Sequence, residues 1–122
     1  MKPVRFDYYA PSSSEEALDL LGQYGDDAKI LAGGQSLMPL MNMRLVRPKV
    51  VIDINRVDGL SYISPGQDGG LAVGAMTRQR EIERSALVRE TVPLLASVIP
   101  YIGHFQIRNR GTVGGSLAHS DP

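Results

Sequence analysis

The sequence of 122 residues lacks cysteine and lacks an excess of either charge. Without cysteine, the chain has no disulfide bond, no cysteine nucleophile and no thiolate ligand for an iron–sulfur cluster or a zinc ion. Its 13 basic and 13 acidic side chains cancel. This balance argues against a general nucleic-acid binder, which needs a basic excess to offset phosphates. No apolar run reaches the roughly 18 residues of a membrane-spanning helix, so no transmembrane segment is expected.

The first residues also lack the pattern of a secretory signal, because Met1–Phe6 is short and mixed in character and is followed by Asp7. We therefore expect a cytoplasmic protein. The length suits one ordinary domain or two small subdomains.

Local patterns in the first half predict a helix after a short extended entry. Ser13–Glu16 fits a Ser-x-x-Glu capping box, and Gly25 is the expected left-handed residue after the helix. These signals predict a helix over Ser14–Tyr24. Its expected buried face consists of Ala17, Leu18, Leu21 and Tyr24.

Two apolar runs, Lys29–Ala32 and Val50–Ile54, predict buried strands. Between them, Leu37–Met43 is apolar and has Pro39 where it suits the first turn of a short helix. Its methionines are expected to face the core, where packing explains them: Met38, Met41 and Met43. This order of strands and helices favours an α/β or α+β layer structure.

A change of unit is expected at Asn55–Gly59, and we place the boundary between residues 56 and 57. Leu60–Ser64 and Leu71–Gly74 flank a turn at Pro65-Gly66 and together predict a hairpin.

Helices are expected after the hairpin. Thr77 is the expected cap of a helix that runs through Ile82. Val88–Ile99 is a second apolar stretch, for which we predict a helix with Pro93 in its first turn.

The first candidate site is Ala32-Gly33-Gly34-Gln35-Ser36, between a predicted strand and a predicted helix. A phosphate group needs several backbone N–H donors that converge without Cβ atoms in the way. Two glycines followed by a helix N-terminus provide them, and Ser36 adds a hydroxyl donor. The alternative is a tight turn that binds nothing.

The second candidate site is the segment from Arg108 to Ser116, in which Thr112-Val113-Gly114-Gly115-Ser116 repeats the pattern of two glycines and a hydroxyl. The segment sets Arg108 and Arg110 beside this pattern, and one pyrophosphate held between the two candidate segments would use both of them. The alternative is again a turn, with the arginines on a solvated surface.

Other site classes are disfavoured by missing residues. Neither G-x-G-x-x-G nor the P-loop signature occurs, which argues against a Rossmann domain or a P-loop enzyme. Met38 stands where a G-x-S-x-G nucleophile elbow around Ser36 needs its second glycine, so His104 and His119 have no expected serine partner. With Asp121, these histidines are too few and too scattered to predict a metal site.

Two further interpretations concern individual side chains. Asp53 ends an apolar strand and is expected to cap the next turn rather than act as an acid. A minor alternative is a single-strand nucleic-acid site in which Phe105 stacks on bases while Arg108 and Arg110 neutralise phosphates.

The segment from Lys29 to Pro39 resembles the first flavin loop of the FAD-binding medium subunits of molybdenum hydroxylases, such as carbon monoxide dehydrogenase and xanthine dehydrogenase. The segment from Ile107 to His119 resembles the second flavin loop. Other motifs agree in order: Tyr9-Ala10-Pro11 before the first loop, and Val51–Ile54 and Gly74–Thr77 between the two loops. The resemblance covers essentially the whole chain.

The resemblance implies an α+β, two-subdomain FAD-binding domain of the p-cresol methylhydroxylase and vanillyl-alcohol oxidase type. Residues 1–56 would form subdomain 1, and residues 57–122 the amino-terminal part of subdomain 2. FAD would lie between them, held by Leu31, Ala32, Gly33, Gly34, Gln35, Ser36, Thr112, Val113, Gly114, Gly115 and Ser116. No catalytic side chain and no metal ligand is implied.

The resemblance also implies partners. A molybdopterin-containing large subunit would oxidise the substrate, and an iron–sulfur small subunit would pass the electrons to FAD and on to an external acceptor. The lack of cysteine in this chain agrees with clusters on partner chains.

Members of this family are considerably longer, and this chain stops at Pro122, just past the second resembling segment. A truncated second subdomain is therefore expected. The alternative function is a non-catalytic fragment or interaction module that keeps the architecture, holds no FAD and self-associates.

Overall fold

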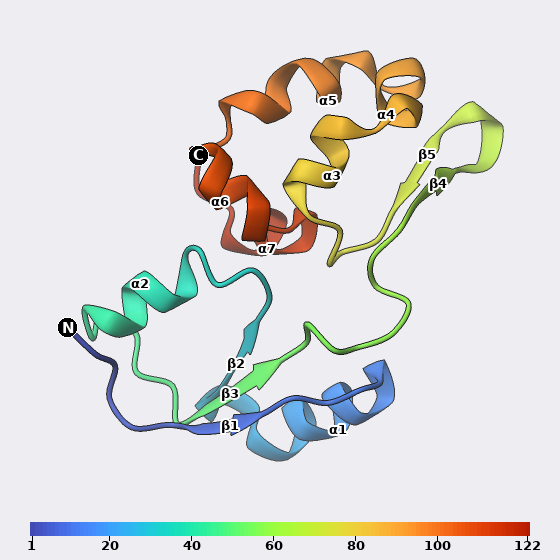
Figure 1. Ribbon diagram of the computed structural model, residues 1–122. Helices are drawn as coiled ribbons and strands as arrows, with labels where there is room; N and C mark the ends of the chain where they lie inside the picture. Colours follow the sequence, from blue (N-terminus) through green and yellow to red (C-terminus); the bar gives the residue numbers. More distant parts are fainter. The chain divides into compact units, whose positions relative to one another are not determined.

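The computed structural model describes residues 1–122, which divide into two compact units, Met1–Asp58 and Gly59–Pro122. Both units contain helices and strands, as expected for a mixed α and β class (Figure 1). The longest helix has 11 residues, and none has the length and apolar character needed to cross a bilayer.

Unit 1 is a parallel sheet of three strands in the order β1-β3-β2, with two main helices. Its elements are β1 (Asp7–Tyr9), α1 (Ser14–Tyr24), the 3-10 turn η1 (Gly25–Asp27), β2 (Ala28–Leu31), α2 (Leu37–Asn42) and β3 (Val50–Asp53).

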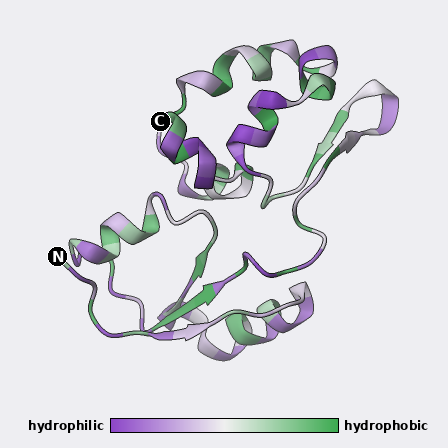
Figure 2. Cartoon of the chain, in the orientation of Figure 1, coloured by the Kyte–Doolittle hydropathy of each residue, from purple (hydrophilic) through white to green (hydrophobic).

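The central strand β3 forms the core of unit 1. Val50 and Ile52 pack with Ala28 and with side chains of α1, whereas Val51, on the opposite face, is equally buried. Burial on both faces explains the continuous β-branched run, since each such side chain contributes roughly 1.5–3 kcal/mol when buried. Figure 2 shows β3 as hydrophobic.

Strand β2 is an edge strand, so the prediction of a buried strand is only partly correct. Ala28 is buried, but Lys29 and Ile30 are exposed.

The predicted helix over Ser14–Tyr24 is confirmed residue for residue. Ser13 Oγ accepts from the Glu16 amide at 3.1 Å, and the Glu16 carboxylate accepts from the Ser12 amide, one residue before the position that a capping box uses.

Two details of this helix were predicted wrongly. Leu18 is 67% exposed, and Leu20 packs against the core in its place, because Leu20 and not Leu18 lies a helical turn from Ala17. Gly25 has a positive φ of 52° but a ψ of −128°, so it is not a left-handed helical residue.

The predicted short helix at Leu37–Met43 is confirmed as α2. Only Met41 is fully buried; Met38 is half-buried and Met43 is 48% exposed. The prediction of a core position for all three methionines is therefore wrong for Met43, which follows the end of the helix.

Unit 2 is a two-stranded hairpin with short helices. Its elements are β4 (Ile63–Pro65), η2 (Gln67–Gly69), β5 (Leu71–Val73), α3 (Gln79–Arg84), α4 (Ala86–Thr91), α5 (Pro93–Val98), η3 (Ile99–Tyr101), α6 (Phe105–Arg110) and α7 (Val113–His119). Ile82, Val88 and Ile99 form its core, against which the hairpin residues Ile63 and Val73 pack.

The predicted hairpin is confirmed, with Ile63 opposite Val73 in an antiparallel pair. Its connection is longer than the expected Pro65-Gly66 turn and includes η2, closed by a 2.8 Å bond from the Gly66 amide to the Gly70 carbonyl.

The helices after the hairpin differ from the prediction in two places. Thr77 does not cap α3; its hydroxyl accepts from the Tyr62 amide and donates to the Tyr62 carbonyl, which ties the hairpin to the helix entry. The stretch from Val88 to Ile99 is two helices rather than one. Pro93 begins the second, because its ring and missing N–H prevent the first from continuing.

Candidate functional site

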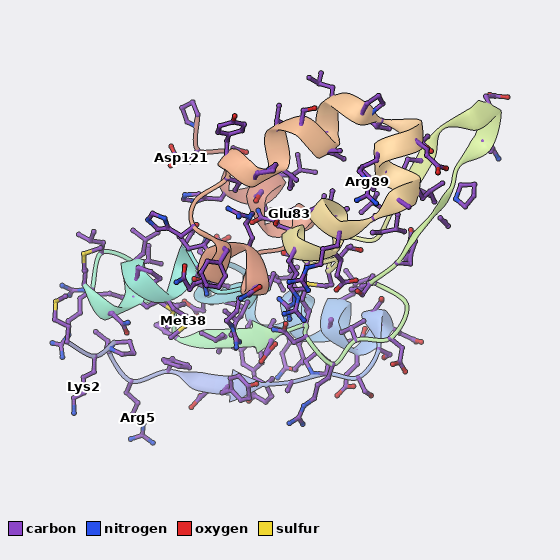
Figure 3. The ribbon with its side chains drawn as sticks, turned by 45° about the horizontal axis from the view of Figure 1, so that its top comes forward. Lys2, Arg5, Met38, Glu83, Arg89 and Asp121 are labelled. Carbon is purple, nitrogen blue, oxygen red and sulfur yellow. The ribbon has the colours of Figure 1, made fainter.

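The first glycine segment, Ala32–Ser36, connects β2 to α2, as predicted. Gly34 has a φ of 76°, and a Cβ there would lie 3.2 Å from Leu31 Cδ1 and 3.3 Å from Met38 Cγ. Met38 is labelled on α2 in Figure 3. Glycine is therefore favoured at position 34 by its backbone conformation, and the Leu31 and Met38 side chains leave little room for a Cβ.

The carbonyl groups of this segment are used inside unit 1. The Ala32 carbonyl accepts from Asn55 Nδ2 at 2.8 Å, and the Gly34 carbonyl accepts from the Met38 amide at 3.1 Å. By contrast, none of the amide groups of residues 33–36 donates a hydrogen bond to the chain. These four consecutive N–H groups have no partner in the chain, and residues 34–36 are at least partly exposed, whereas Gly33 is buried. A row of such donors suits an anion such as a phosphate.

A network of polar side chains adjoins this segment at the carboxyl ends of the parallel strands. The Tyr8 hydroxyl donates to Asp53 Oδ2 at 2.5 Å. Asp53 Oδ1 accepts from the backbone amide and from Nδ2 of Asn55. The prediction that Asp53 caps the turn after its strand is confirmed.

The network fixes the ionisation of its members. Partial burial opposes the charge on Asp53, but hydrogen bonds from Tyr8 and Asn55 outweigh burial and hold the pKa of Asp53 below its usual value. The same hydrogen bond to Asp53 raises the pKa of the Tyr8 hydroxyl. Asp53 is therefore a carboxylate and Tyr8 a neutral donor at pH 7.

Sequence reasoning missed Tyr8 and Asn55. A signal was present, because Asp-x-Asn after a buried strand is a pattern in which the aspartate accepts from the backbone two residues on.

The second glycine segment, Thr112–Ser116, is the start of a helix and not the tight turn that was the alternative to a ligand site. Thr112 caps α7 and accepts from the Gly115 amide at 3.1 Å, and residues 113–116 form the first turns of that helix. The Val113 and Gly114 amides donate to the carbonyls of Thr77 and Ala75. With the Ser116 amide bonded to the Thr112 carbonyl, all four amides of residues 113–116 are used inside unit 2.

Gly114 serves packing. A Cβ at this position would lie 2.8 Å from the carbonyl oxygen and 2.9 Å from the Cβ of Ala75, so only glycine lets α7 approach this backbone.

Ser116 is the polar group of the second segment that remains exposed. Its hydroxyl oxygen accepts from Gln79 Nε2 at 2.6 Å, which leaves the hydroxyl hydrogen able to donate elsewhere. Gln79 itself is 3% exposed, and its Oε1 has no partner.

Arg108 is neither a solvated arginine nor an available anion ligand, so both readings of it are wrong. It is 9% exposed and forms an ion pair with Glu83 at 3.0 Å (Glu83 is labelled in Figure 3). Its Nη1 donates to the carbonyls of Pro100, Ile102 and Gly103. The stacking site imagined from Phe105, Arg108 and Arg110 therefore loses one of its two cations.

Comparison with known proteins gives a consistent family. Residues 4–122 match the family described as the FAD binding domain in molybdopterin dehydrogenase. The chain is 52% identical over 121 residues to the 6-hydroxypseudooxynicotine dehydrogenase complex subunit alpha of Paenarthrobacter nicotinovorans, covering 99% of this chain and 40% of that protein. It is 47% identical to the carbon monoxide dehydrogenase medium chain of Hydrogenophaga pseudoflava, covering all of this chain and 42% of that protein.

Solved structures agree. The carbon monoxide dehydrogenase of Hydrogenophaga pseudoflava superposes with a TM-score of 0.96 at 48% identity, covering 100% of this chain and 42% of that one. Quinoline 2-oxidoreductase from Pseudomonas putida 86 gives 0.93 at 44% identity, covering 99% of this chain and 42% of that one. The chain thus spans about two fifths of the length of the relatives it matches.

Proposed function

Since the chain belongs to the family of FAD-binding domains in molybdopterin dehydrogenases, we propose that it holds FAD as part of an oxidoreductase subunit. The observation that carries this proposal is the row of unpaired amide groups from Gly33 to Ser36. The pyrophosphate of FAD is an anion with several acceptor oxygens, which consecutive N–H donors match.

The two segments contribute differently under this proposal. Ala32–Ser36 would hold the pyrophosphate, chiefly through the unpaired amides of residues 33–36, with Leu31 adjoining the cofactor. Thr112–Ser116 would contribute the Ser116 hydroxyl and the close approach that two glycines allow, because its amides already donate inside unit 2.

The finer fold assignment is part of the same proposal. Residues 1–56 and 57–122 would form the subdomains of a domain of the p-cresol methylhydroxylase and vanillyl-alcohol oxidase type, and this boundary lies two residues before the division between the two units. Support comes from the match of the whole chain to FAD-binding relatives.

The cofactor, when bound, supplies two-electron and one-electron transfer that no side chain of this protein provides. The protein's own residues bind and orient it. We propose that the electrons come from a large molybdopterin-containing subunit through a small iron–sulfur subunit, and leave to an external acceptor. Two relatives are named as a complex subunit and a medium chain, which supports a place among partner subunits.

The test is titration of the 122-residue chain with FAD, followed by flavin fluorescence and by gel filtration. We expect saturable uptake near one FAD per chain. Gly33→Asp places a carboxylate beside the donor amides and should weaken binding by at least tenfold. Gly22→Asp makes the same charge change in α1, where nothing lies within 4 Å of the new Cβ, and should leave binding unchanged.

Failure has a specific form. A folded chain that takes up no FAD, even when produced together with molybdenum and iron–sulfur partner subunits, would overturn the proposal. Self-association of that colourless chain would then favour the alternative of an interaction module.

A further inference from the structure

The hydrogen-bond ladder between β3 and β2 ends immediately before the first glycine segment. Its last backbone bond joins the Ile54 amide to the Leu31 carbonyl at 3.0 Å. The next carbonyl, that of Ala32, accepts instead from the side chain of Asn55 at 2.8 Å. A side-chain amide thus holds the backbone immediately after the last hydrogen bond between β2 and β3.

The Asn55 side chain is itself held in place. Its Nδ2 also donates to Asp53 Oδ1 at 2.6 Å, and the same oxygen accepts from the Asn55 backbone amide. On the other side, Asp53 Oδ2 accepts from the Tyr8 hydroxyl of the neighbouring strand β1. Three residues from β1, β3 and the turn after β3 therefore form one continuous connection to the Ala32 carbonyl.

This connection holds the backbone at Ala32, immediately before two residues whose own dihedral angles are weakly restricted. Gly33 and Gly34 follow Ala32, and glycine restricts its backbone dihedrals less than any other residue. Fixing the peptide group before a glycine pair reduces the number of directions in which the following N–H groups point. A segment ordered before binding loses less conformational freedom when the ligand arrives.

We propose that Tyr8, Asp53 and Asn55 are positioning residues for the cofactor's phosphate site: they fix the Ala32 carbonyl and thereby hold the amides of residues 33–36 in their unpaired arrangement. This inference rests on the proposed function for its ligand. None of the three residues is required to touch the cofactor.

The experiment measures the order of the segment and the binding of FAD separately. Heteronuclear 15N relaxation of the FAD-free chain reports the mobility of the amides of residues 33–36, and titration reports the FAD dissociation constant. Asn55→Leu keeps the branched heavy-atom skeleton of the side chain and removes both Nδ2 donors; it should make the segment mobile and weaken FAD binding about tenfold. Tyr8→Phe removes only the outer bond, with an expected weakening of two- to threefold.

Tyr9→Phe is the matched control. Tyr9 is the next residue of the same strand, and its hydroxyl pairs with that of Tyr24, 2.7 Å away and outside this connection. The control should leave both readouts within the error of the unchanged chain.

The outcomes separate the two proposals. Rigid amides at residues 33–36 in both Asn55→Leu and Tyr8→Phe would overturn the positioning role, whatever happens to FAD. An equal loss of binding in Tyr9→Phe would also overturn it, because the effect would then reflect general loss of stability. If the unchanged chain binds no FAD, the proposed function fails, while the relaxation data still decide the positioning role. If Asn55→Leu does not fold, Tyr8→Phe decides alone.

Discussion

The first glycine segment leaves its amide groups unpaired, whereas the second segment uses all of its amides from Val113 to Ser116 within unit 2. Both segments contain two adjacent glycines and a serine. In the first, Gly34 is needed for a positive φ; in the second, Gly114 is needed because the backbone of Ala75 lies too close for any Cβ.

The difference teaches that a glycine pair indicates a constraint without naming its kind. Unpaired donors point to a ligand, and paired donors point to packing. The two segments should therefore respond differently to substitution: changes in the first should alter binding more than stability, and changes in the second should alter stability more than binding.

The largest effect is expected for Arg108→Ala. The change leaves Glu83 without its cation and three carbonyls without their donor, so urea unfolding should show a loss of about 3 kcal/mol. Arg110→Ala, on the exposed end of the same helix, should change stability by less than about 0.5 kcal/mol. A stable Arg108→Ala variant that loses FAD affinity would show that Arg108 acts in FAD binding rather than in packing.

Gly114→Ala should be next in size. A methyl group 2.8 Å from the Ala75 carbonyl oxygen forces α7 to move, and overpacking of this kind costs about 1–3 kcal/mol. Urea unfolding measures the loss. Gly22→Ala is the control, because nothing lies within 4 Å of its new Cβ and alanine favours a helix interior by roughly 0.5–1 kcal/mol. Equal stability of the two variants would show that the close contact is not a constraint.

Gly34→Ala should have the opposite effect to Gly114→Ala, with a larger loss of FAD binding than of stability. Alanine at a φ of 76° costs about 1–2 kcal/mol, and relaxation of the strain should redirect the neighbouring amides. We expect FAD binding to weaken about tenfold while most of the stability remains, as measured by titration and urea unfolding of the same sample. Loss of stability without loss of binding would assign the first segment to packing as well.

Much of the fold follows from local sequence. The limits of α1 are set by Ser13 and Gly25, and β3 is set by a β-branched run. What local sequence does not contain is the neighbour across space. Leu18 fits an apolar face but faces solvent, and β2 is apolar yet lies at a sheet edge.

The candidate site also has a part that local sequence predicts and a part that it does not. The first segment was predicted as a phosphate-type turn because strand, glycine pair and helix are consecutive in the sequence. The true partners of Thr77, Gly114 and Arg108 lie 15, 39 and 25 positions away, at Tyr62, Ala75 and Glu83. No local pattern encodes those distances, so neither the helix that begins at the second segment nor the buried ion pair of Arg108 could be predicted from the sequence.

The smallest effect is a difference in acid response. The pKa of Asp53 is lowered in the folded chain, so the stability it contributes is present above its unfolded pKa near 4 and is lost as pH falls through the folded value. The loss should be under about 1 kcal/mol, because the group is only partly buried and water still screens it.

Amide chemical shifts between pH 3 and 6 make this response measurable at each segment. The Gly34 signal should follow the titration of Asp53 through Asn55 and Ala32, and Asp53→Asn should abolish that dependence. The Gly114 signal should stay constant over the same range, because its amide donates to the backbone carbonyl of Ala75, which does not titrate. If the Gly34 signal does not change as Asp53 titrates, the network of Tyr8, Asp53 and Asn55 does not act on the first segment. The two segments would then differ only in whether their amides are paired.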